Sequence, residues 1–190
     1  MFSEVIVGVD KRSAGGGEVM SVLVVVTAAS RHHATSEIAE AIAAGFVQRG
    51  VDAEARPLEQ ITSLDGFDAV VLGSAIYMGR WLRAAREFVS EHEAELSAMP
   101  VWLFSSGPLG PPDRLIPLGE SADTDRIAEL VGARGHRVFA GRLERASLGF
   151  AERAAAKAVH APDGDCRDWA AVDSFAGEIT SELSAERAER

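Results

Sequence analysis

The sequence predicts an α/β protein in which helices cover both faces of a doubly wound parallel sheet, and two observations support this. Apolar runs rich in β-branched residues, such as Val22–Val26 and Ala69–Gly73, are typical of strands that are buried on both faces. Segments with helical periodicity separate these runs, so crossover helices are expected to join successive strands. No internal repeat or linker divides the chain, which indicates a single domain.

The first predicted helix, Thr35–Arg49, has Ile38, Ile42 and Phe46 along one face, and Gly50 ends it. The other predicted elements, in chain order, are a short alternating strand at Val51–Pro57, the buried strand Ala69–Gly73, a helix at Trp81–Leu96, the buried strand Val101–Phe104, a short helix capped by Asp123 that ends near Gly132, the buried strand Arg137–Ala140, and helices at Leu148–Val159 and Cys166–Leu183. The last helix is expected to bury one stripe: Trp169, Val172, Phe175, Ala176 and Ile179.

Composition excludes several classes of function. The 190 residues include 19 Lys and Arg against 29 Asp and Glu, and the resulting net charge of −10 argues against non-specific binding to nucleic acid. The single cysteine, Cys166, permits neither an intrachain disulfide nor a cysteine-based zinc site, which fits a reducing, cytoplasmic setting. The longest apolar run, Val22–Ala29, is too short to span a bilayer, so any membrane contact is expected to be peripheral.

Residues 1–20 are expected to precede the folded domain, which we assign to residues 21–190. The tract Ser13–Gly17 is glycine-rich and flexible, and Met20 directly precedes the first strong strand. We therefore expect this segment to be either a disordered tail or a spurious translated leader, with Met20 as the native start.

The loops that follow the buried strands are the candidate site, because ligands of doubly wound sheets bind beyond the carboxyl ends of the strands. The first loop, Thr27–Thr35, consists largely of small and hydroxyl-bearing residues and leads into a helix. Ser30 and Thr35 are candidate donors to an anion at the helix N-terminus. The alternative interpretation is that Thr35 only caps the helix.

The next two loops suit a flat aromatic ligand. In Gly73–Trp81, the ring of Tyr77 is able to stack on such a ligand while loop N–H groups reach its polar edge. The turn-rich loop Ser105–Pro112 follows the next buried strand. The alternative for both loops is a structural connection in which Tyr77 packs as a lid.

Read together, four segments resemble the flavodoxin fold and, within it, the menaquinone-dependent protoporphyrinogen IX dehydrogenases and their flavodoxin-domain relatives. The segments are Ala29–Thr35, Gly73–Trp81, Phe104–Gly110, and a distal motif that comprises His160–Asp165 and Arg167–Trp169. The resemblance implies a five-stranded parallel sheet with the order 2-1-3-4-5 in three layers. It also implies non-covalent binding of FMN.

The resemblance further implies which residues bind this cofactor. The phosphate would be held by Ser30, Arg31, His32 and Thr35, in a turn that also contains His33 and Ala34. The isoalloxazine ring would be flanked on one side by Ser74, Ala75, Ile76, Tyr77, Met78 and Gly79, and on the other by Ser105, Ser106 and Gly107. Two residues depart from the family pattern, with His33 where relatives usually have glycine and Ala28 where they usually have tyrosine.

The implied activity is that of an FMN-dependent oxidoreductase, similar to protoporphyrinogen dehydrogenase, that uses a quinone or another small acceptor. The flavin supplies the chemistry, so no catalytic side chain is expected. A peptide at Met78–Gly79 is expected to turn its carbonyl toward the flavin N5–H, since glycine makes this rotation sterically cheap. Arg80 is a candidate for recognising a carboxylated substrate, and the alternative is that Arg80, Arg83 and Arg86 form a solvated helix face.

Two other functions remain open. One is a flavodoxin-type carrier that passes electrons to a redox partner protein. The other is a flavodoxin-like domain that has lost FMN and serves in binding or regulation, an alternative that rests on His33 and Ala28. A receiver domain, a dinucleotide-binding domain and an α/β-hydrolase are set aside because their motifs are absent, and the scattered histidines make a metal site improbable.

Overall fold

The computed structural model describes residues 22–107, 122–143, 149 and 164–189. The expected N-terminal extension lies outside these residues, as does the helix expected at Leu148–Val159 apart from Gly149. The third predicted loop is described only as far as Gly107.

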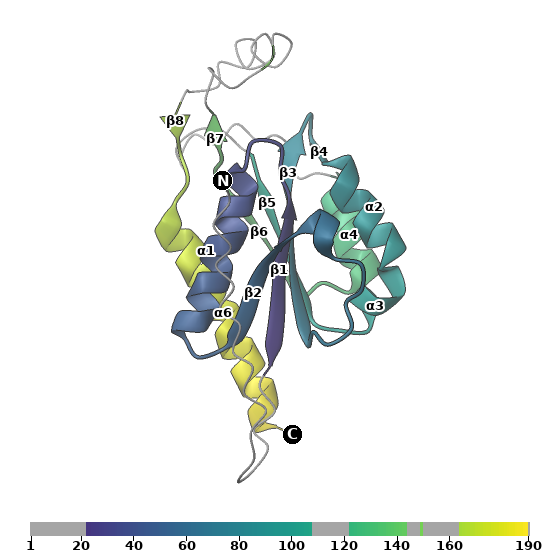
Figure 1. Ribbon diagram of the computed structural model, residues 1–190, viewed down its shortest axis with the longest axis vertical. Coiled ribbons are helices and arrows are strands. Elements are labelled where there is room, and N and C mark those ends of the chain that lie inside the picture. The colour runs from purple at the N-terminus through teal and green to yellow at the C-terminus, as the bar shows by residue number, and fades with distance from the viewer. Residues whose placement is uncertain (1–21, 108–121, 144–148, 150–163, 190) are drawn as a thin grey trace.

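A parallel sheet forms the centre of the molecule, with the strand order β2-β1-β3-β5-β6 (Figure 1). This order confirms the predicted 2-1-3-4-5 arrangement of five parallel strands. The register places Val26 beside Val71 and Leu72 beside Leu103. The strands are β1 (Leu23–Ala29), β2 (Asp52–Pro57), β3 (Ala69–Tyr77), β5 (Val101–Ser106) and β6 (Gly135–Phe139).

Two short additions lie near the carboxyl ends of the parallel strands. Strand β4 (Arg80–Trp81) turns back from β3 and pairs with it in the antiparallel direction. Strands β7 (Arg142–Leu143) and β8 (Gly164–Asp165) form a separate antiparallel pair at the same end of the molecule (Figure 1). A single 3₁₀ turn, η1 (Leu58–Gln60), follows β2.

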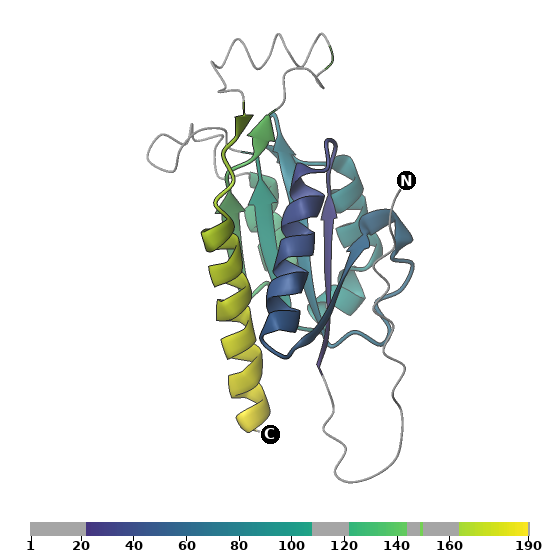
Figure 2. The same ribbon diagram turned by 60° about the vertical axis from the view of Figure 1, so that its left-hand side comes forward.

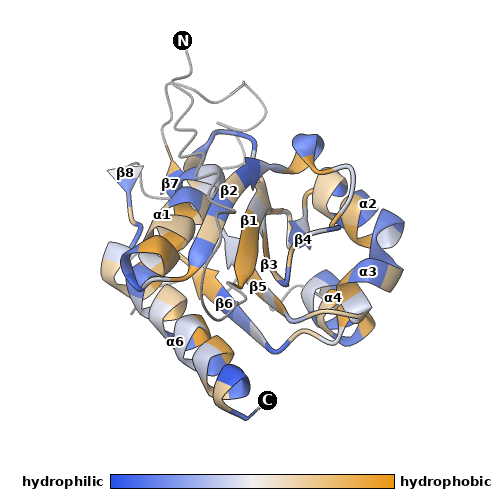
Figure 3. Ribbon diagram, turned by 60° about the horizontal axis from the view of Figure 1, so that its bottom comes forward, coloured by the Kyte–Doolittle hydropathy of each residue, from blue (hydrophilic) through white to orange (hydrophobic). Residues whose placement is uncertain are grey.

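Helices cover both faces of the sheet and complete three layers (Figure 2). Helices α1 (Ala34–Gln48) and α6 (Trp169–Ala188) pack on one face, over the side chains of Val24, Val26 and Phe104. The other face is covered by α2 (Arg83–Glu91), α3 (Glu93–Ser97) and α4 (Ala122–Val131). Hydrophobic residues concentrate on the central strands, whereas the outer surfaces of the helices are more hydrophilic (Figure 3).

The prediction of one continuous helix at Trp81–Leu96 is wrong in two places. Trp81 belongs to β4, and its buried indole packs against the sheet. His92 then separates α2 from α3, with φ −110° and ψ 21°. Its Nδ1 lies 2.5 Å from Glu95 Oε2, so the side chain stabilises the start of a second short helix.

Three further expectations need correction. The last strand is not buried, because β6 is the edge of the described sheet and alternates between inward and outward side chains. The last helix begins at Trp169 rather than Cys166, and Trp169 is 44% exposed instead of buried. Asp123 lies within the first turn of α4, where its carboxylate binds Arg80 rather than capping the helix.

Candidate functional site

The three predicted loops meet at the carboxyl edge of the sheet. The guanidinium carbon of Arg31, from the first loop, lies 4.9 Å from the ring centroid of Tyr77 in the second. Gly107, from the third loop, has φ 147°, and a Cβ there would lie 3.0 Å from the carbonyl oxygen of Ile76. Glycine therefore permits a close approach between the second and third loops that no other residue allows.

The first loop turns sharply into α1. His33 has φ 60° and immediately precedes the helix, in the left-handed region that favours glycine. The Ala34 N–H donates to the His32 carbonyl at 2.8 Å, and the Thr35 N–H donates to Ser30 Oγ at 3.3 Å. The proposal that Thr35 caps α1 is thus wrong, since Thr35 lies inside the helix and Ser30 supplies the accepting oxygen.

The second loop is a tight hairpin. Met78 and Gly79 have φ values of 51° and 73° and connect the antiparallel pair Tyr77 and Arg80. Two consecutive positive φ values are the geometry that matches the twist of a two-residue hairpin. The Met78 side chain is 97% exposed, and a Cβ on Gly79 would contact nothing within 4 Å, so this turn has open space around it.

The hydroxyl groups of two predicted site residues bond within the protein. Ser74 Oγ accepts from the Leu82 N–H at 2.9 Å and donates to the Ala75 carbonyl at 2.9 Å. Ser105 Oγ accepts from the Trp81 indole at 2.8 Å and lies 2.8 Å from His136 Nε2. These serines hold β4 and β6 against the sheet, so their hydroxyls are structural.

A histidine that the sequence analysis did not single out completes the second of these contacts. Because the indole N–H of Trp81 only donates, the Ser105 hydroxyl is free to donate to the unprotonated Nε2 of His136. Partial burial lowers the pKa of His136, and the nearby Asp125 carboxylate opposes this effect. The neutral imidazole is therefore the form that suits this contact.

Arg80, the predicted substrate-binding residue, already faces a carboxylate. Its Nε and Nη2 donate to the two carboxylate oxygens of Asp123 at 3.0 and 3.2 Å. The pair raises the pKa of Arg80 and lowers the pKa of Asp123. Arg83 is highly exposed and pairs with Glu87 one helical turn away.

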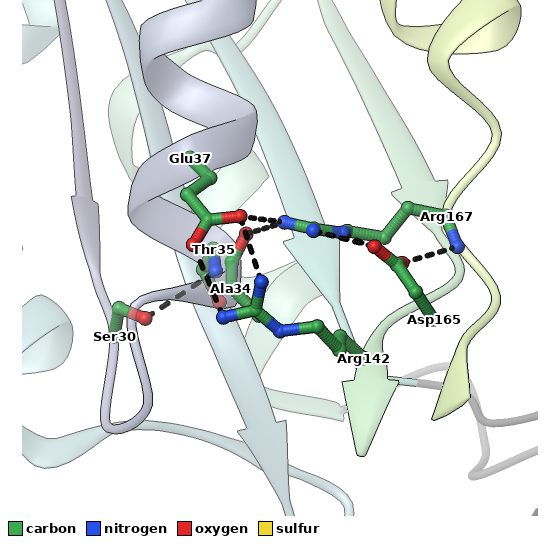
Figure 4. Close-up of polar contacts among 7 residues, drawn as sticks. All are labelled: Ser30, Ala34, Thr35, Glu37, Arg142, Asp165 and Arg167. Atoms are coloured by element: carbon green, nitrogen blue, oxygen red, sulfur yellow. Dashed lines mark hydrogen bonds and ion pairs between the residues drawn. The ribbon is translucent and has the colours of Figure 1, made fainter. Parts of the chain in front are cut away.

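A network of charged residues joins the first turn of α1 to the distal motif (Figure 4). Arg142 donates to both carboxylate oxygens of Glu37 at 3.1 Å, and Arg167 donates to Glu37 Oε2 at 2.6 Å. Arg167 also bonds both carboxylate oxygens of Asp165, at 2.8 and 2.7 Å, and lowers the pKa of Asp165. No local sequence pattern marks Glu37 or Arg142, and only the distal motif that contains Arg167 points to this region from the sequence.

Comparison with known proteins assigns the chain to a family. A family model described as a flavodoxin domain matches residues 25–168. The chain belongs to the flavodoxin domain family. Among curated proteins, no sequence matched. The predicted resemblance to flavodoxins is therefore confirmed at the level of the family.

Solved structures of similar fold include flavodoxins and a longer oxidoreductase chain. The flavodoxin of Streptococcus pneumonia TIGR4 is 16% identical, with a TM-score of 0.55 over 85% of this chain and 99% of that one. A mutant flavodoxin from Pseudomonas aeruginosa is 14% identical, with a TM-score of 0.52 over 82% of this chain and 97% of that one. Rubredoxin oxygen:oxidoreductase from Desulfovibrio gigas is 13% identical, with a TM-score of 0.55 over 87% of this chain and 37% of that one. At these identities the likeness shows the fold alone.

The donor set of this flavodoxin-domain protein fits a flavin phosphate. The loop before α1 carries one hydroxyl, one guanidinium and two imidazole groups, on Ser30, Arg31, His32 and His33, at the positive end of the helix dipole. Hydroxyl, amide and guanidinium donors are the groups that bind phosphate oxygens. The adjacent Tyr77 ring and the open Met78–Gly79 turn offer an aromatic face and backbone groups to a flat ring.

Two other classes of site find no support in the part of the chain that the structure describes. Within it, no three acidic, histidine or cysteine side chains are grouped so as to hold a metal ion. Nor is any helix among these residues both long and apolar enough to cross a membrane.

Proposed function

We propose that this protein binds FMN without a covalent bond and acts as an FMN-dependent oxidoreductase. The observation that carries this proposal is the meeting of three loops beyond β1, β3 and β5, in contact through Arg31, Tyr77, Ile76 and Gly107. The order of strands reverses between β1 and β3, and ligands of doubly wound sheets bind at that switch point. Membership of the flavodoxin domain family supports the same choice of cofactor.

In this proposal each loop has a separate role. The turn at 30–35 holds the phosphate through Ser30 Oγ, the Arg31 guanidinium and the positive end of the α1 dipole. The backbone at 74–79 and 105–107 flanks the ring, and the Tyr77 ring stacks on it. His33 adopts the positive φ that glycine usually supplies in relatives, so the substitution is compatible with the turn.

Bound FMN supplies hydride and single-electron transfer. The chain binds and orients the cofactor, and the Met78–Gly79 peptide is our candidate for the carbonyl that accepts a hydrogen bond from a ring N–H. Gly79 has positive φ and open space around it, so glycine on this side of the peptide lowers the steric cost of rotating it.

For the substrate, we propose a reaction like that of protoporphyrinogen dehydrogenase, with a quinone or another small molecule as electron acceptor. Recognition of a porphyrin carboxylate by Arg80 would either use donors other than the Nε–H and Nη2–H that bind Asp123 or displace Asp123 from the guanidinium. The existing Arg80–Asp123 pair favours a second candidate, a carrier that passes electrons to a redox partner protein without a substrate site of its own.

The first experiment is the visible absorption spectrum of the purified protein before and after addition of FMN. Flavin bands near one equivalent, with FMN as the released cofactor, would support the proposal. A colourless protein that also fails to bind added FMN would refute it and favour a binding or regulatory role.

The second experiment separates the two redox functions. We expect the FMN-loaded protein to oxidise a porphyrinogen with a quinone as acceptor, and Arg80→Met to raise KM several-fold through loss of a solvent-screened charged hydrogen bond to the substrate. Arg83→Met, on the exposed helix face, is the matched control and should leave KM unchanged. Electron transfer between a reductase and an acceptor protein without porphyrinogen turnover would favour the carrier.

A further inference from the structure

The peptide bond between Ala34 and Thr35 is held at both ends. Its carbonyl oxygen, on Ala34, accepts from Arg167 Nη1 at 3.2 Å. Its N–H, on Thr35, donates to Ser30 Oγ at 3.3 Å. Arg167 therefore fixes the orientation of the same peptide that positions the loop serine (Figure 4).

The side chain that holds this peptide is itself firmly fixed. Arg167 is 3% exposed, although arginine is seldom buried unless its charge is paired. It is anchored by both oxygens of Asp165 and by Glu37, and its guanidinium carbon lies 4.4 Å from the ring centroid of Trp169. The distal segment at 164–169 thereby controls a loop that lies about 130 residues earlier in the chain.

Glu37 gives the two arginines a second role. It lies in the first turn of α1, where a carboxylate complements the helix dipole but repels an anionic ligand at the same terminus. Arg142 and Arg167 both bind this carboxylate, and with Asp165 the four charges sum to zero. The network therefore removes the repulsion without removing the acidic residue.

We propose that Arg167 and Arg142 are positioning residues for phosphate recognition, which make this site select a flavin phosphate over an unphosphorylated flavin. The inference rests on the proposed binding of FMN. Arg167 acts through the Ala34–Thr35 peptide and through Glu37, Arg142 acts through Glu37, and neither needs to touch the ligand. Neutral substitution of Arg167 leaves the network with a net negative charge, whereas Glu37→Gln leaves it with a net positive charge.

The test compares the dissociation constants of FMN and riboflavin, measured by quenching of flavin fluorescence on the cofactor-free full chain. In Arg167→Met we expect FMN binding to weaken about tenfold, equivalent to about 1.4 kcal/mol, with riboflavin binding nearly unchanged. Glu37→Gln should tighten FMN binding about threefold, within the range of a single charge at a helix terminus. Opposite signs for the two variants are not expected from a purely structural role.

Arg49→Met is the matched control, because Arg49 bonds a backbone carbonyl and a carboxylate at the other end of α1. Its ratio of riboflavin to FMN dissociation constants should equal that of the wild type. If Arg167→Met does not fold, Arg142→Met provides the same test, since it removes one of the two cations on Glu37. An unchanged ratio in Arg167→Met or Arg142→Met overturns this inference alone, whereas failure of the wild type to bind FMN overturns the proposed function.

Discussion

Two arginines bind the opposite ends of α1 and join the helix to the C-terminal segment, yet their surroundings differ. At the carboxyl end of α1, Arg49 donates to the Gly45 carbonyl and to both oxygens of Asp173, and its side chain is 30% exposed. At the amino end, Arg167 donates to the Ala34 carbonyl, to Glu37 and to Asp165, and is almost fully buried. Hydrogen bonds from arginine to carboxylates and a backbone carbonyl thus hold α1 against α6 at its carboxyl end, whereas at its amino end they hold the turn that precedes α1.

Backbone strain separates the two ends as well. At the carboxyl end, the residue with positive φ that follows α1 is Gly50, which adopts this conformation at little cost. At the amino end, the corresponding conformation belongs to His33, and the neighbouring hairpin has Met78 in the same region. Strained residues of this kind cluster at functional sites, so the comparison points to the amino end as the functional end of the helix.

The largest expected effect concerns the two arginines. Arg167→Met should lower the free energy of unfolding by about 2–3 kcal/mol, because it leaves the partly buried carboxylates of Glu37 and Asp165 short of a cation. Arg49→Met should cost much less, as expected for an exposed pair. Urea denaturation of both variants measures the difference, and equal losses would show that the two ends are equivalent.

A second substitution tests close packing at the carboxyl end of α1. A Cβ on Gly45 would lie 2.9 Å from the Ala176 Cβ of α6, so Gly45→Val should destabilise the protein by about 1–2 kcal/mol through overpacking. Ala44→Val, on the exposed side of the same helix, is the control and should cost only the difference in helix propensity. A Gly45→Val protein as stable as the control would mean that α1 and α6 separate easily there.

Substitution of the residue with positive φ at each end of α1 should change the free energy of unfolding in opposite directions. His33→Gly should raise the unfolding free energy by about 0.5–1 kcal/mol by relieving left-handed strain, and Gly50→Ala should lower it by a similar amount. Thermal denaturation monitored by circular dichroism is sufficient to measure both. A loss of stability in His33→Gly would indicate that the imidazole makes contacts worth more than the strain.

The smallest effect is the dependence of the two arginine contacts on pH. Hydrogen bonds from Arg167 and Arg49 lower the pKa values of Asp165 and Asp173 in the folded state. Each contact therefore stabilises the protein above the ordinary carboxyl pKa of about 4, and this contribution disappears as pH falls through the lowered folded value. The stability difference between wild type and either variant should shrink on acidification, and a constant difference would exclude this linkage.

Local sequence patterns were enough to predict most of the fold. The β-branched run at Val22–Val26 and the four-residue spacing of Ile38, Ile42 and Phe46 predict a buried strand and its helix, because burial determines both patterns, and the structure has β1 and α1 there. The break at His92 has no comparable signal, since a helix-compatible apolar stripe continues across it. The exposure of β6 depends on its position at the sheet edge, which is a property of the whole chain.

The candidate site was predictable in part for the same reason. The three loops follow from strand order, because parallel strands bring their carboxyl ends to one edge. The contact between Glu37 and Arg167 spans 130 residues, and although Arg167 lies in the distal motif, no local pattern links it to Glu37. The Ser105 hydroxyl likewise hydrogen-bonds to Trp81 and His136, and only the folded sheet brings these three residues together.

The Ala34–Thr35 peptide, fixed at its carbonyl by Arg167 and at its N–H by Ser30, also has a consequence for the thermodynamics of ligand capture. Ordering a loop on association costs conformational entropy, which lowers affinity. Here folding itself orders this peptide, so the anion meets a preorganised turn. The Thr35 amide should accordingly exchange its hydrogen slowly even without ligand, although the first N–H groups of a helix usually exchange fast because they lack intrahelical partners.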